Sequence, residues 1–228
     1  MTSYDVAGRT VELPVQVRDA SAGTALFEVD AAAAQALLPS DAFEVVEVGP
    51  GRAHFALVVI DYRDNDLGSY REVGLTLFVR PRSGGEDGTF IVRLPVDQPF
   101  TCEAGRTIWG FPKTVEQIEL VYESDHIVCA LSMDGELVLR IRLPRGGSDE
   151  LPPMPMASYT IRDGVPCATT FSQGGSGGQM VFDSSGVELE LGTHPVAKEL
   201  ASLGLPVPAF MSTWTEHFIA TFEDAVPL

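Results

Sequence analysis

A lysine set among aromatic residues offers the most distinctive chemistry in this sequence. The chain of 228 residues has only two lysines, Lys113 and Lys198, and Lys113 closely follows Trp109 and Phe111. A lysine amine attacks a ketone only when it is neutral, and an ordinary lysine, with a pKa of about 10.4, is almost entirely protonated at pH 7. Burial in an apolar pocket can lower a lysine pKa by roughly 3–5 units. A pocket with aromatic walls around Lys113 would therefore give an amine that can form an imine with a ketone.

An ordinary structural role is the alternative for this lysine and for a nearby arginine. Lys113 can begin the strand Val115–Tyr122, with its ammonium group in water and its aliphatic stem over Phe111. Arg106 can bind a substrate carboxylate, because a guanidinium group pairs well with carboxylates, or it can form an ion pair that holds its own loop. Residue types alone leave these alternatives open.

The stretch around Lys113 resembles a known family signature. The string from Gly105 to Lys113 is similar to the motif Gly-Arg-x-x-x-x-aromatic-Pro-Lys, which carries the Schiff-base lysine of the acetoacetate decarboxylase family. The segment His54–Glu72 has the family's strand, loop and Tyr-x-Glu arrangement, and Gly186–Leu191 leads into a helix over Pro195–Leu203 as in the family. The resemblance covers nearly the whole chain and is weak outside these three segments.

This resemblance implies roles for individual residues. Lys113 falls on the family's nucleophile, and Glu72 matches an active-site glutamate that would orient the substrate or relay a proton. Without the resemblance, Glu72 is better interpreted as an exposed glutamate at a strand end. Arg18 is an approximate counterpart of the family's N-terminal active-site arginine. The predicted substrate-binding residues are Arg106, Trp109, Phe111 and Arg18.

Two departures from the family pattern leave the reaction open. The decarboxylases carry a second lysine directly after the nucleophile, where this chain has Thr114, so repulsion between like charges cannot lower the pKa of Lys113. Ala56 stands where the family has a glutamate. The resemblance implies a lyase that decarboxylates a small β-keto acid, with an aldolase-dehydratase acting on pyruvate-like acids as the alternative. A non-catalytic barrel that binds small molecules is a third hypothesis.

Short alternating apolar runs, bounded by Gly, Pro, Asp and Ser, predict many short strands. Asp134-Gly135 and Asp163-Gly164 lie between such runs and predict tight antiparallel hairpins. Asp30 and Pro195 begin two short helices, predicted over Ala31–Leu38 and Val196–Ser202. The expected fold is α+β and β-dominated, an antiparallel sheet or β-barrel with a few short helices, as in the family it resembles. The predicted strands are Thr10–Val17, Thr24–Val29, Phe43–Val48, His54–Tyr62, Glu72–Val79, Thr89–Leu94, Val115–Tyr122, Ile127–Met133, Glu136–Leu143, Ser158–Ile161, Gln179–Phe182 and Val187–Leu191.

Two segments rich in glycine or proline predict connections between strands. Gly174–Gly178 has no strand-then-helix context for binding a phosphate, and we interpret it as a mobile loop, at the mouth of a site. Pro152–Pro155 indicates a stiff connection that does not pair as a strand. Trp214 and Phe218 are spaced as on one face of a helix but fit a strand equally well. Neither the glycine-rich nor the proline-rich segment is a clear linker between domains, so residues 1–228 are expected to form a single domain.

Composition narrows the partners and the compartment. The 15 Lys and Arg residues face 32 Asp and Glu, a net charge of −17 that repels nucleic acids and anionic membranes. The N-terminal residues lack a basic segment followed by an apolar one, so we expect a cytoplasmic protein. The four histidines and three cysteines are too scattered for a metal site, and imine chemistry needs no cofactor. The expected partner is a small keto acid substrate, and the family's habit implies a homo-oligomer.

Overall fold

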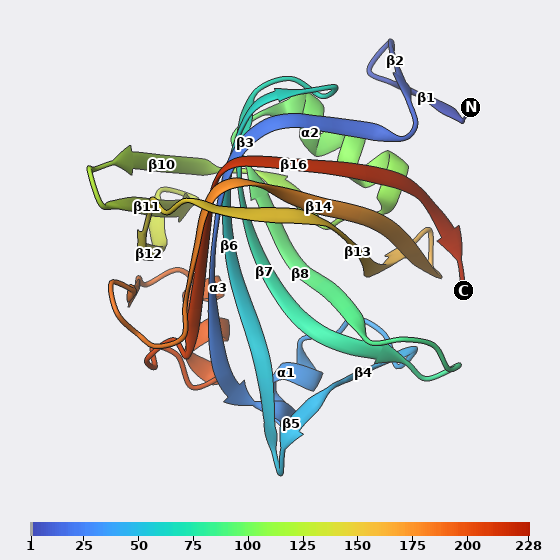
Figure 1. The fold of residues 1–228 in the computed structure, drawn as a ribbon. Coiled ribbons are helices and arrows are strands. Elements are labelled where there is room, and N and C mark those ends of the chain that lie inside the picture. The colour runs from blue at the N-terminus through green and yellow to red at the C-terminus, as the bar shows by residue number, and fades with distance from the viewer. Residues whose placement is uncertain (1) are drawn as a thin grey trace.

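Seven long strands close into a barrel in the computed structural model, which describes residues 2–228 (Figure 1). Each barrel strand pairs with its neighbour in the order β7, β6, β3, β16, β14, β13 and β8, and pairing of β8 with β7 closes the ring. The strands are β1 (Ser3–Val6), β2 (Arg9–Glu12), β3 (Val15–Asp30), β4 (Phe43–Val45), β5 (Glu47–Gly49), β6 (Arg52–Asn65), β7 (Tyr70–Pro81), β8 (Gly88–Val96), β9 (Lys113–Val115), β10 (Gln117–Tyr122), β11 (His126–Met133), β12 (Glu136–Pro144), β13 (Asp149–Arg162), β14 (Val165–Val181), β15 (Glu188–Leu191) and β16 (Met211–Pro227). The helices are α1 (Ala31–Ala36), α2 (Pro99–Ala104), the π-helical turn η1 (Gly105–Trp109) and α3 (Pro195–Ser202).

The predicted fold class is confirmed, because strands dominate and the helices are short. Nearly all strand pairs are antiparallel, and the exceptions among the described residues are β13 with β8 and β8 with β9. Both predicted Asp-Gly hairpins are present. Asp134-Gly135 and Asp163-Gly164 adopt positive φ angles between paired strands, as tight hairpin turns require.

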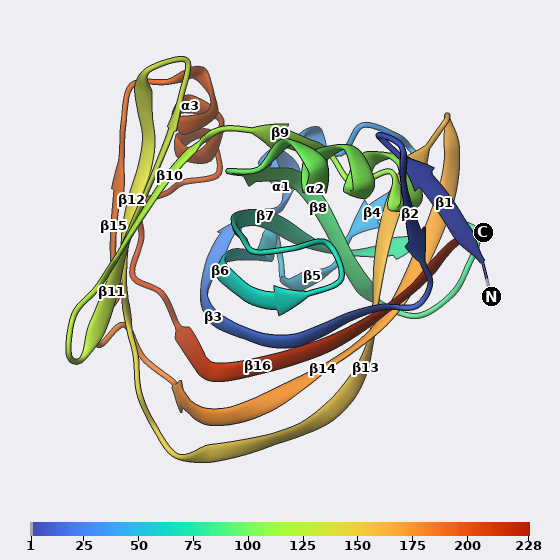
Figure 2. The ribbon, with the colours of Figure 1, turned by 90° about the horizontal axis from the view of Figure 1, so that it is seen from above.

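A second sheet lies beside the barrel. Strands β10, β11, β12 and β15 form this four-stranded sheet, with α3 next to it at one side of the barrel (Figure 2). Its buried side chains, such as Leu131, Leu139 and Ile141, belong to the same apolar cluster as Trp214 of β16 and Leu57 of β6. The two sheets therefore share one hydrophobic core.

Strands β6 and β7 present a different surface on each of their two faces. On β7, Val73, Leu75 and Leu77 are buried in the shared core, whereas the residues between them face the interior of the barrel. Side chains alternate between the faces of a strand, so one strand contributes to a core on one side and to a cavity on the other. This explains the central apolar runs of the two strands, Phe55–Ile60 in β6 and Val73–Val79 in β7, the second interrupted only by Thr76.

The prediction of a mobile loop at the glycine-rich segment was wrong. Gly174–Gly178 lies within β14 and pairs with β16, and Figure 1 shows these two strands bending together. A Cβ atom on Gly174 would lie 2.6 Å from the carbonyl oxygen of Leu151, and one on Gly175 would collide with the carbonyl of His217. The glycines are required because three backbones approach closely at this bend.

The prediction that the proline-rich segment does not pair as a strand was also wrong. Pro152–Pro155 lies within β13, which pairs with β14 along most of its length. The pairing steps from Leu151 directly to Met154, and this irregularity leaves two of the prolines without a ladder position. Prolines are tolerated in a strand where such an irregularity removes the need for their missing N–H groups.

The predicted helices are present with small changes at their ends. Asp30 caps α1 by accepting a hydrogen bond from the backbone N–H of Ala33 at 2.8 Å, and this helix ends at Ala36. Trp214 and Phe218 lie in the long strand β16. The three cysteines are buried and free of disulfides. Among residues 2–228, no helix is long and apolar enough to cross a membrane.

Candidate active site

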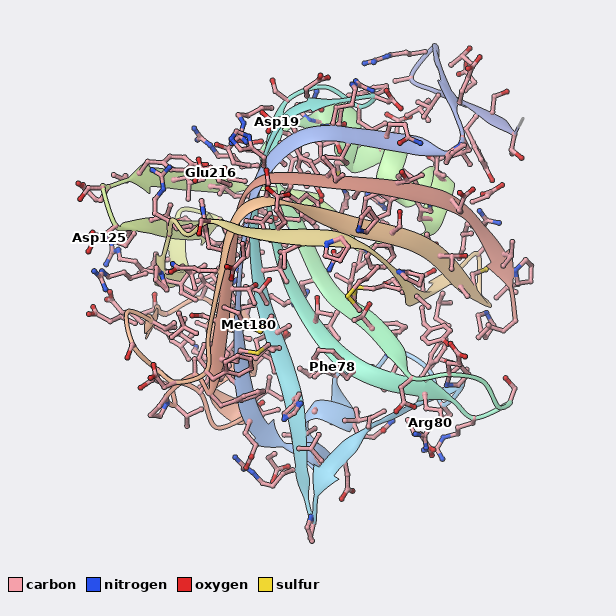
Figure 3. The ribbon with its side chains drawn as sticks, in the orientation of Figure 1. Asp19, Phe78, Arg80, Asp125, Met180 and Glu216 are labelled. Atoms are coloured by element: carbon pink, nitrogen blue, oxygen red, sulfur yellow. The ribbon has the colours of Figure 1, made fainter. Side chains whose placement is uncertain are left out.

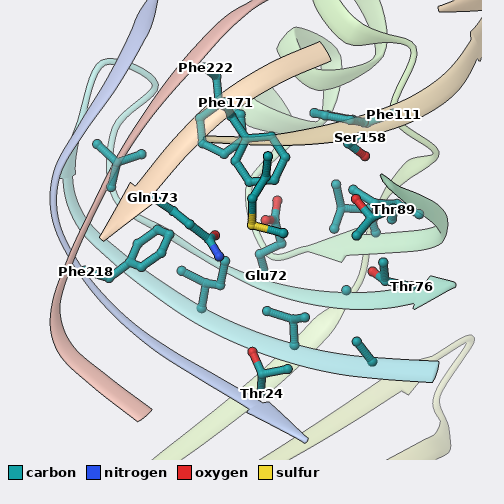
Figure 4. A pocket seen from close by; sticks show the side chains of 18 of the residues that line it. Thr24, Glu72, Thr76, Thr89, Phe111, Ser158, Phe171, Gln173, Phe218 and Phe222 are labelled. Carbon is teal, nitrogen blue, oxygen red and sulfur yellow. The ribbon is translucent and has the colours of Figure 1, made fainter. Parts of the chain in front are cut away.

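A cavity of about 430 Å³ opens inside the barrel. Its lining comes from the inward faces of β3, β6, β7, β8, β13, β14 and β16, with η1 and β9 at one end. Figure 4 shows Glu72 and Thr76 of β7 directed into this space, opposite Phe171 of β14 and Phe222 of β16. A volume of this size is typical of a small-molecule site.

Lys113 and Glu72 form an ion pair that is almost fully buried. The Lys113 Nζ and Glu72 Oε2 atoms are 2.7 Å apart, and the two side chains are 4% and 8% exposed. Both residues line the cavity. Strand β8 lies between their strands, with Val96 paired to Glu72 and Leu94 paired to Lys113, so the lysine reaches across one strand to the carboxylate.

Three hydroxyl-bearing side chains surround the pair. Tyr62 donates a hydrogen bond to Glu72 Oε1 at 3.1 Å, and Lys113 Nζ donates one to the Thr101 hydroxyl at 3.3 Å. The ammonium lies 4.9 Å from the centre of the Tyr70 ring, which stacks on Tyr62. Burial raises the pKa of both tyrosines, so their phenols keep their protons. Two hydrogen bonds and a cation–π contact therefore stabilise the charged pair.

The pKa of Lys113 is not lowered in this site, contrary to the expectation from burial alone. Desolvation lowers the pKa, but the Glu72 carboxylate and the Tyr70 phenol outweigh it, so the pKa is raised above the ordinary value. The resting state is therefore an ammonium paired with a carboxylate. Desolvation follows from burial alone, whereas the opposing effect depends on the contact between Glu72 and the amine, which the sequence does not reveal.

This geometry gives the lysine another way to become neutral. Glu72 Oε2 accepts no well-aligned hydrogen bond apart from its close approach to Lys113 Nζ. A proton can therefore move from Nζ to Oε2 within the pair, which leaves a neutral amine and a neutral acid without changing the total buried charge. A base within hydrogen-bonding reach of the reacting group is the geometry that general base catalysis needs.

The α2 helix and η1 hold the lysine in place. The side chain of Gln98 caps α2 by accepting a hydrogen bond from the Thr101 N–H, and Pro99 occupies the first turn. The turn η1 ends at Trp109 and is capped by Gly110, whose positive φ of 71° suits a residue without a side chain. The sequence interpretation missed this helix, although the Gln98-Pro99 start and the Gly110 stop are recognisable signals.

Replacement of Gly105 by alanine is expected to disturb the lysine directly. A Cβ atom at this position would lie 2.5 Å from Lys113 Cδ and 2.6 Å from Cε. Overpacking of this kind costs about 1–3 kcal/mol, against a gain of about 1 kcal/mol in helix propensity. We expect kcat/KM to fall at least tenfold while the free energy of unfolding changes by less than about 2 kcal/mol. Steady-state kinetics with parallel urea unfolding checks this, and unchanged kinetics would contradict it.

The two predicted aromatic residues lie at the site. Trp109 and Phe111 line the cavity, and their rings stack with centroids 5.6 Å apart. The Trp109 indole N–H donates to the backbone carbonyl of Glu223 in β16 at 2.8 Å, which ties η1 to the barrel wall. Both rings therefore line the same cavity as Lys113.

The two predicted arginines lie away from the cavity lining. Arg18 forms ion pairs with Asp64 at 2.8 Å and Asp66 at 2.6 Å, and about half of its side chain is exposed. Its neighbour Val17 lines the cavity instead, because adjacent strand residues face opposite ways. Arg106 is exposed on η1. Among residues 2–228, Lys113 is the single cationic side chain in the lining.

Tyr62 and Thr101 are site residues that the sequence interpretation missed. The signal for Tyr62 lies in the hairpin of β6 and β7, whose register pairs Tyr62 with Tyr70 and Ile60 with Glu72. Residues two apart on a strand share a face, so Tyr62 has to face the same way as Glu72's partner Ile60. Thr101 carries no such signal, because its position depends on the unpredicted α2. No cluster of three metal-ligating side chains occurs in the described part of the chain.

Comparisons with known proteins found one matching family model and several similar structures. The family model described as acetoacetate decarboxylase (ADC) matches residues 4–221. An acetoacetate decarboxylase structure from Legionella pneumophila subsp. pneumophila str. Philadelphia 1 is 19% identical with a TM-score of 0.65, covering 94% of this chain and 87% of that one. The enduracididine biosynthesis enzyme MppR is 18% identical with a TM-score of 0.66, covering 96% and 88%. An acetoacetate decarboxylase-like enzyme from Sphingomonas wittichii RW1 is 15% identical with a TM-score of 0.59, covering 96% and 94%. No curated protein sequence matches the chain.

Proposed function

The chain belongs to the acetoacetate decarboxylase family, and from that premise we propose that it is a lyase that forms an imine between Lys113 and the ketone of a keto acid. The observation that carries this proposal is the buried Lys113–Glu72 pair at one end of the barrel cavity. Burying two charges is costly unless they are well paired. A buried pair that also lines an open cavity fits a catalytic role better than a purely structural one.

The proposed reaction begins with the ion pair. Glu72 takes a proton from Lys113 Nζ, and the neutral amine adds to the ketone carbon of the substrate. A proton passes from the nitrogen to the former carbonyl oxygen, which gives a carbinolamine. Glu72 then returns its proton to the carbinolamine hydroxyl group, which leaves as water and gives a positively charged iminium group. The iminium withdraws electrons from the neighbouring bond, as in covalent catalysis by lysine. Tyr62, hydrogen bonded to Glu72 Oε1, holds the carboxylate in position through these transfers.

We propose decarboxylation of a β-keto acid as the step that follows. The bond between the carboxyl carbon and C2 breaks, CO2 leaves, and the electron pair forms the enamine double bond while the iminium nitrogen becomes neutral. C2 then takes up a proton from solvent, and water releases the ketone product and the Lys113 amine. The step removes a negative charge from an apolar site, so a poorly solvated carboxylate favours it.

The lining of the cavity favours this reaction over aldol chemistry. A pyruvate-like substrate keeps its carboxylate throughout the reaction, and a buried carboxylate without a paired cation is costly. In the described lining, Lys113 is the one cationic group, and the positive charge of its iminium serves as the electron sink of the reaction. A β-keto acid bears the cost of a buried carboxylate only until that carboxylate leaves as CO2.

Borohydride reduction tests the proposed imine. Incubation with acetoacetate and borohydride should add a reduced adduct to the peptide that contains Lys113, seen by mass spectrometry, with release of CO2 in the absence of borohydride. Pyruvate is the second probe, and an adduct with pyruvate but not acetoacetate would favour the aldolase-dehydratase alternative. Labelling at Lys198, or no adduct with either acid, would reject the imine proposal and leave a binding function.

A further inference from the structure

The catalytic pair occupies one end of a cavity that continues along the barrel. On β7, residues 70, 72, 74, 76 and 78 all line it, as alternate residues of a strand must when they share a face. Phe78 lies six positions beyond Glu72, which corresponds to about 20 Å of strand. Phe78 and Arg80 lie near the end of β7 that is remote from α2 (Figure 3). The cavity therefore extends far beyond the reach of a four-carbon acid bound at Lys113.

The walls of this extension are mostly apolar. Level with Thr76, the strand register places Ala56 of β6, Leu26 of β3 and Met211 of β16, and Val58 and Met156 also line the cavity. The aromatic Phe222 lies instead at the catalytic end, where its ring centroid is 6.0 Å from that of Trp109. The polar residues in the lining of the described chain, apart from Lys113 and Glu72, are uncharged. Close to the pair, Gly74 has no side chain, so the passage from Glu72 to Thr76 stays open. Such a surface recognises hydrocarbon through the removal of apolar area from water.

From these observations, we propose that the substrate is a β-keto acid with a long, uncharged aliphatic chain attached to the ketone carbon. The inference rests on the proposed function and specifies its substrate class. The ketone lies at Lys113, the carboxylate leaves as CO2, and the chain extends along β7 past Thr76 toward Phe78. The product is a methyl ketone with the same chain. The acid is thus held by its chain rather than by its carboxylate, for which the lining offers no arginine among the described residues.

A series of 3-oxo acids tests this inference on the unmodified protein. We expect kcat/KM for CO2 release to rise about three- to fourfold per added methylene, the change that corresponds to about 0.8 kcal/mol per buried methylene. Between 3-oxobutanoate and 3-oxooctanoate the increase should then be about 100-fold or more. A flat or falling series, with the Lys113 adduct still formed, would overturn the long-chain inference alone. Absence of any Lys113 adduct would instead overturn the proposed function.

A pair of phenylalanine variants tests where the chain lies. Thr76→Phe adds a ring on the inward face of β7, four residues beyond Glu72, whereas Met180→Phe changes an exposed residue that does not line the cavity. The ratio of kcat/KM for 3-oxooctanoate to that for 3-oxobutanoate should fall at least tenfold in Thr76→Phe and stay constant in Met180→Phe. An unchanged ratio in a folded Thr76→Phe protein would contradict the proposed path. Inhibition of the unmodified protein by 2-undecanone and acetone gives a second measurement, in which the longer ketone should bind at least 100-fold more tightly.

Discussion

Replacement of Lys113 by methionine is expected to abolish catalysis, with kcat/KM reduced by roughly 10⁴-fold or more, because the covalent intermediate cannot form. Methionine approximates the length of the lysine stem, which lies close to Gly105, so the change removes mainly the amine. Steady-state CO2 release from a 3-oxo acid and borohydride trapping both measure the effect. The trapped adduct should disappear completely.

Lys198 supplies the matched control for this change. It is the other lysine of the chain, and it lies exposed on α3. Lys198→Met should leave both turnover and the adduct at Lys113 unaltered. Removing Lys113 also leaves Glu72 buried without its partner, a loss that costs about 3–5 kcal/mol for a buried ion pair. The double variant Lys113→Met with Glu72→Gln should recover part of that stability without recovering activity, and any substantial turnover in a folded Lys113→Met protein would contradict the imine mechanism.

Replacement of Glu72 by glutamine is expected to lower kcat/KM by about 10²–10⁴-fold, the usual contribution of a general acid–base group. Glutamine keeps the shape and the hydrogen bond from Tyr62, but it cannot take the proton from Lys113. The pKa of Lys113 should fall at the same time, because desolvation then acts without the carboxylate that opposes it. The pH dependence of amine modification, followed by mass spectrometry, separates this effect from a loss of folding.

The same ion pair predicts how stability depends on pH. The folded-state pKa of Lys113 is raised above its ordinary value of 10.5, so the stabilisation is complete below that pH and is lost as the pH rises through the higher folded-state value. Urea unfolding should therefore show a larger loss of stability above about pH 10.5 for the wild type than for Glu72→Gln. Both proteins share the loss at high pH that the buried phenols of Tyr62 and Tyr70 cause. Equal pH profiles for the two proteins would indicate that the pair does not stabilise the folded state.

The sequence predicts much of the fold because its signals are local. Asp134-Gly135 gives a hairpin turn from its own backbone preferences, and alternation along β6 and β7 follows from the pleat of each strand. The bend at Gly174–Gly178 is different, because the need for glycine there comes from a neighbouring backbone in β13 and another in β16. No local pattern distinguishes such a crossing from a flexible loop.

In the candidate site, too, local signals are predictable from the sequence, and features that depend on contacts between distant segments are not. Lys113 and Glu72 were predicted from a motif, whereas the distance between them and the direction of the lysine pKa depend on two strand pairings across β8. Arg18, an approximate match to the family's arginine, shows how an error of one position changes the predicted role of a residue. One residue along a strand is the difference between facing a cavity and facing solvent, and its neighbour Val17 takes the inward position.

The two-faced strands β6 and β7 give the protein a route by which its specificity can change in evolution. Positions 73, 75 and 77 hold the shared core, whereas positions 74, 76 and 78 shape the cavity. Side chains on the second set can become larger or smaller without opening a void in the core, so such changes carry little of the usual penalty of core substitutions. Descendants of this chain can thus exchange one substrate for another while the barrel and its lysine stay as they are.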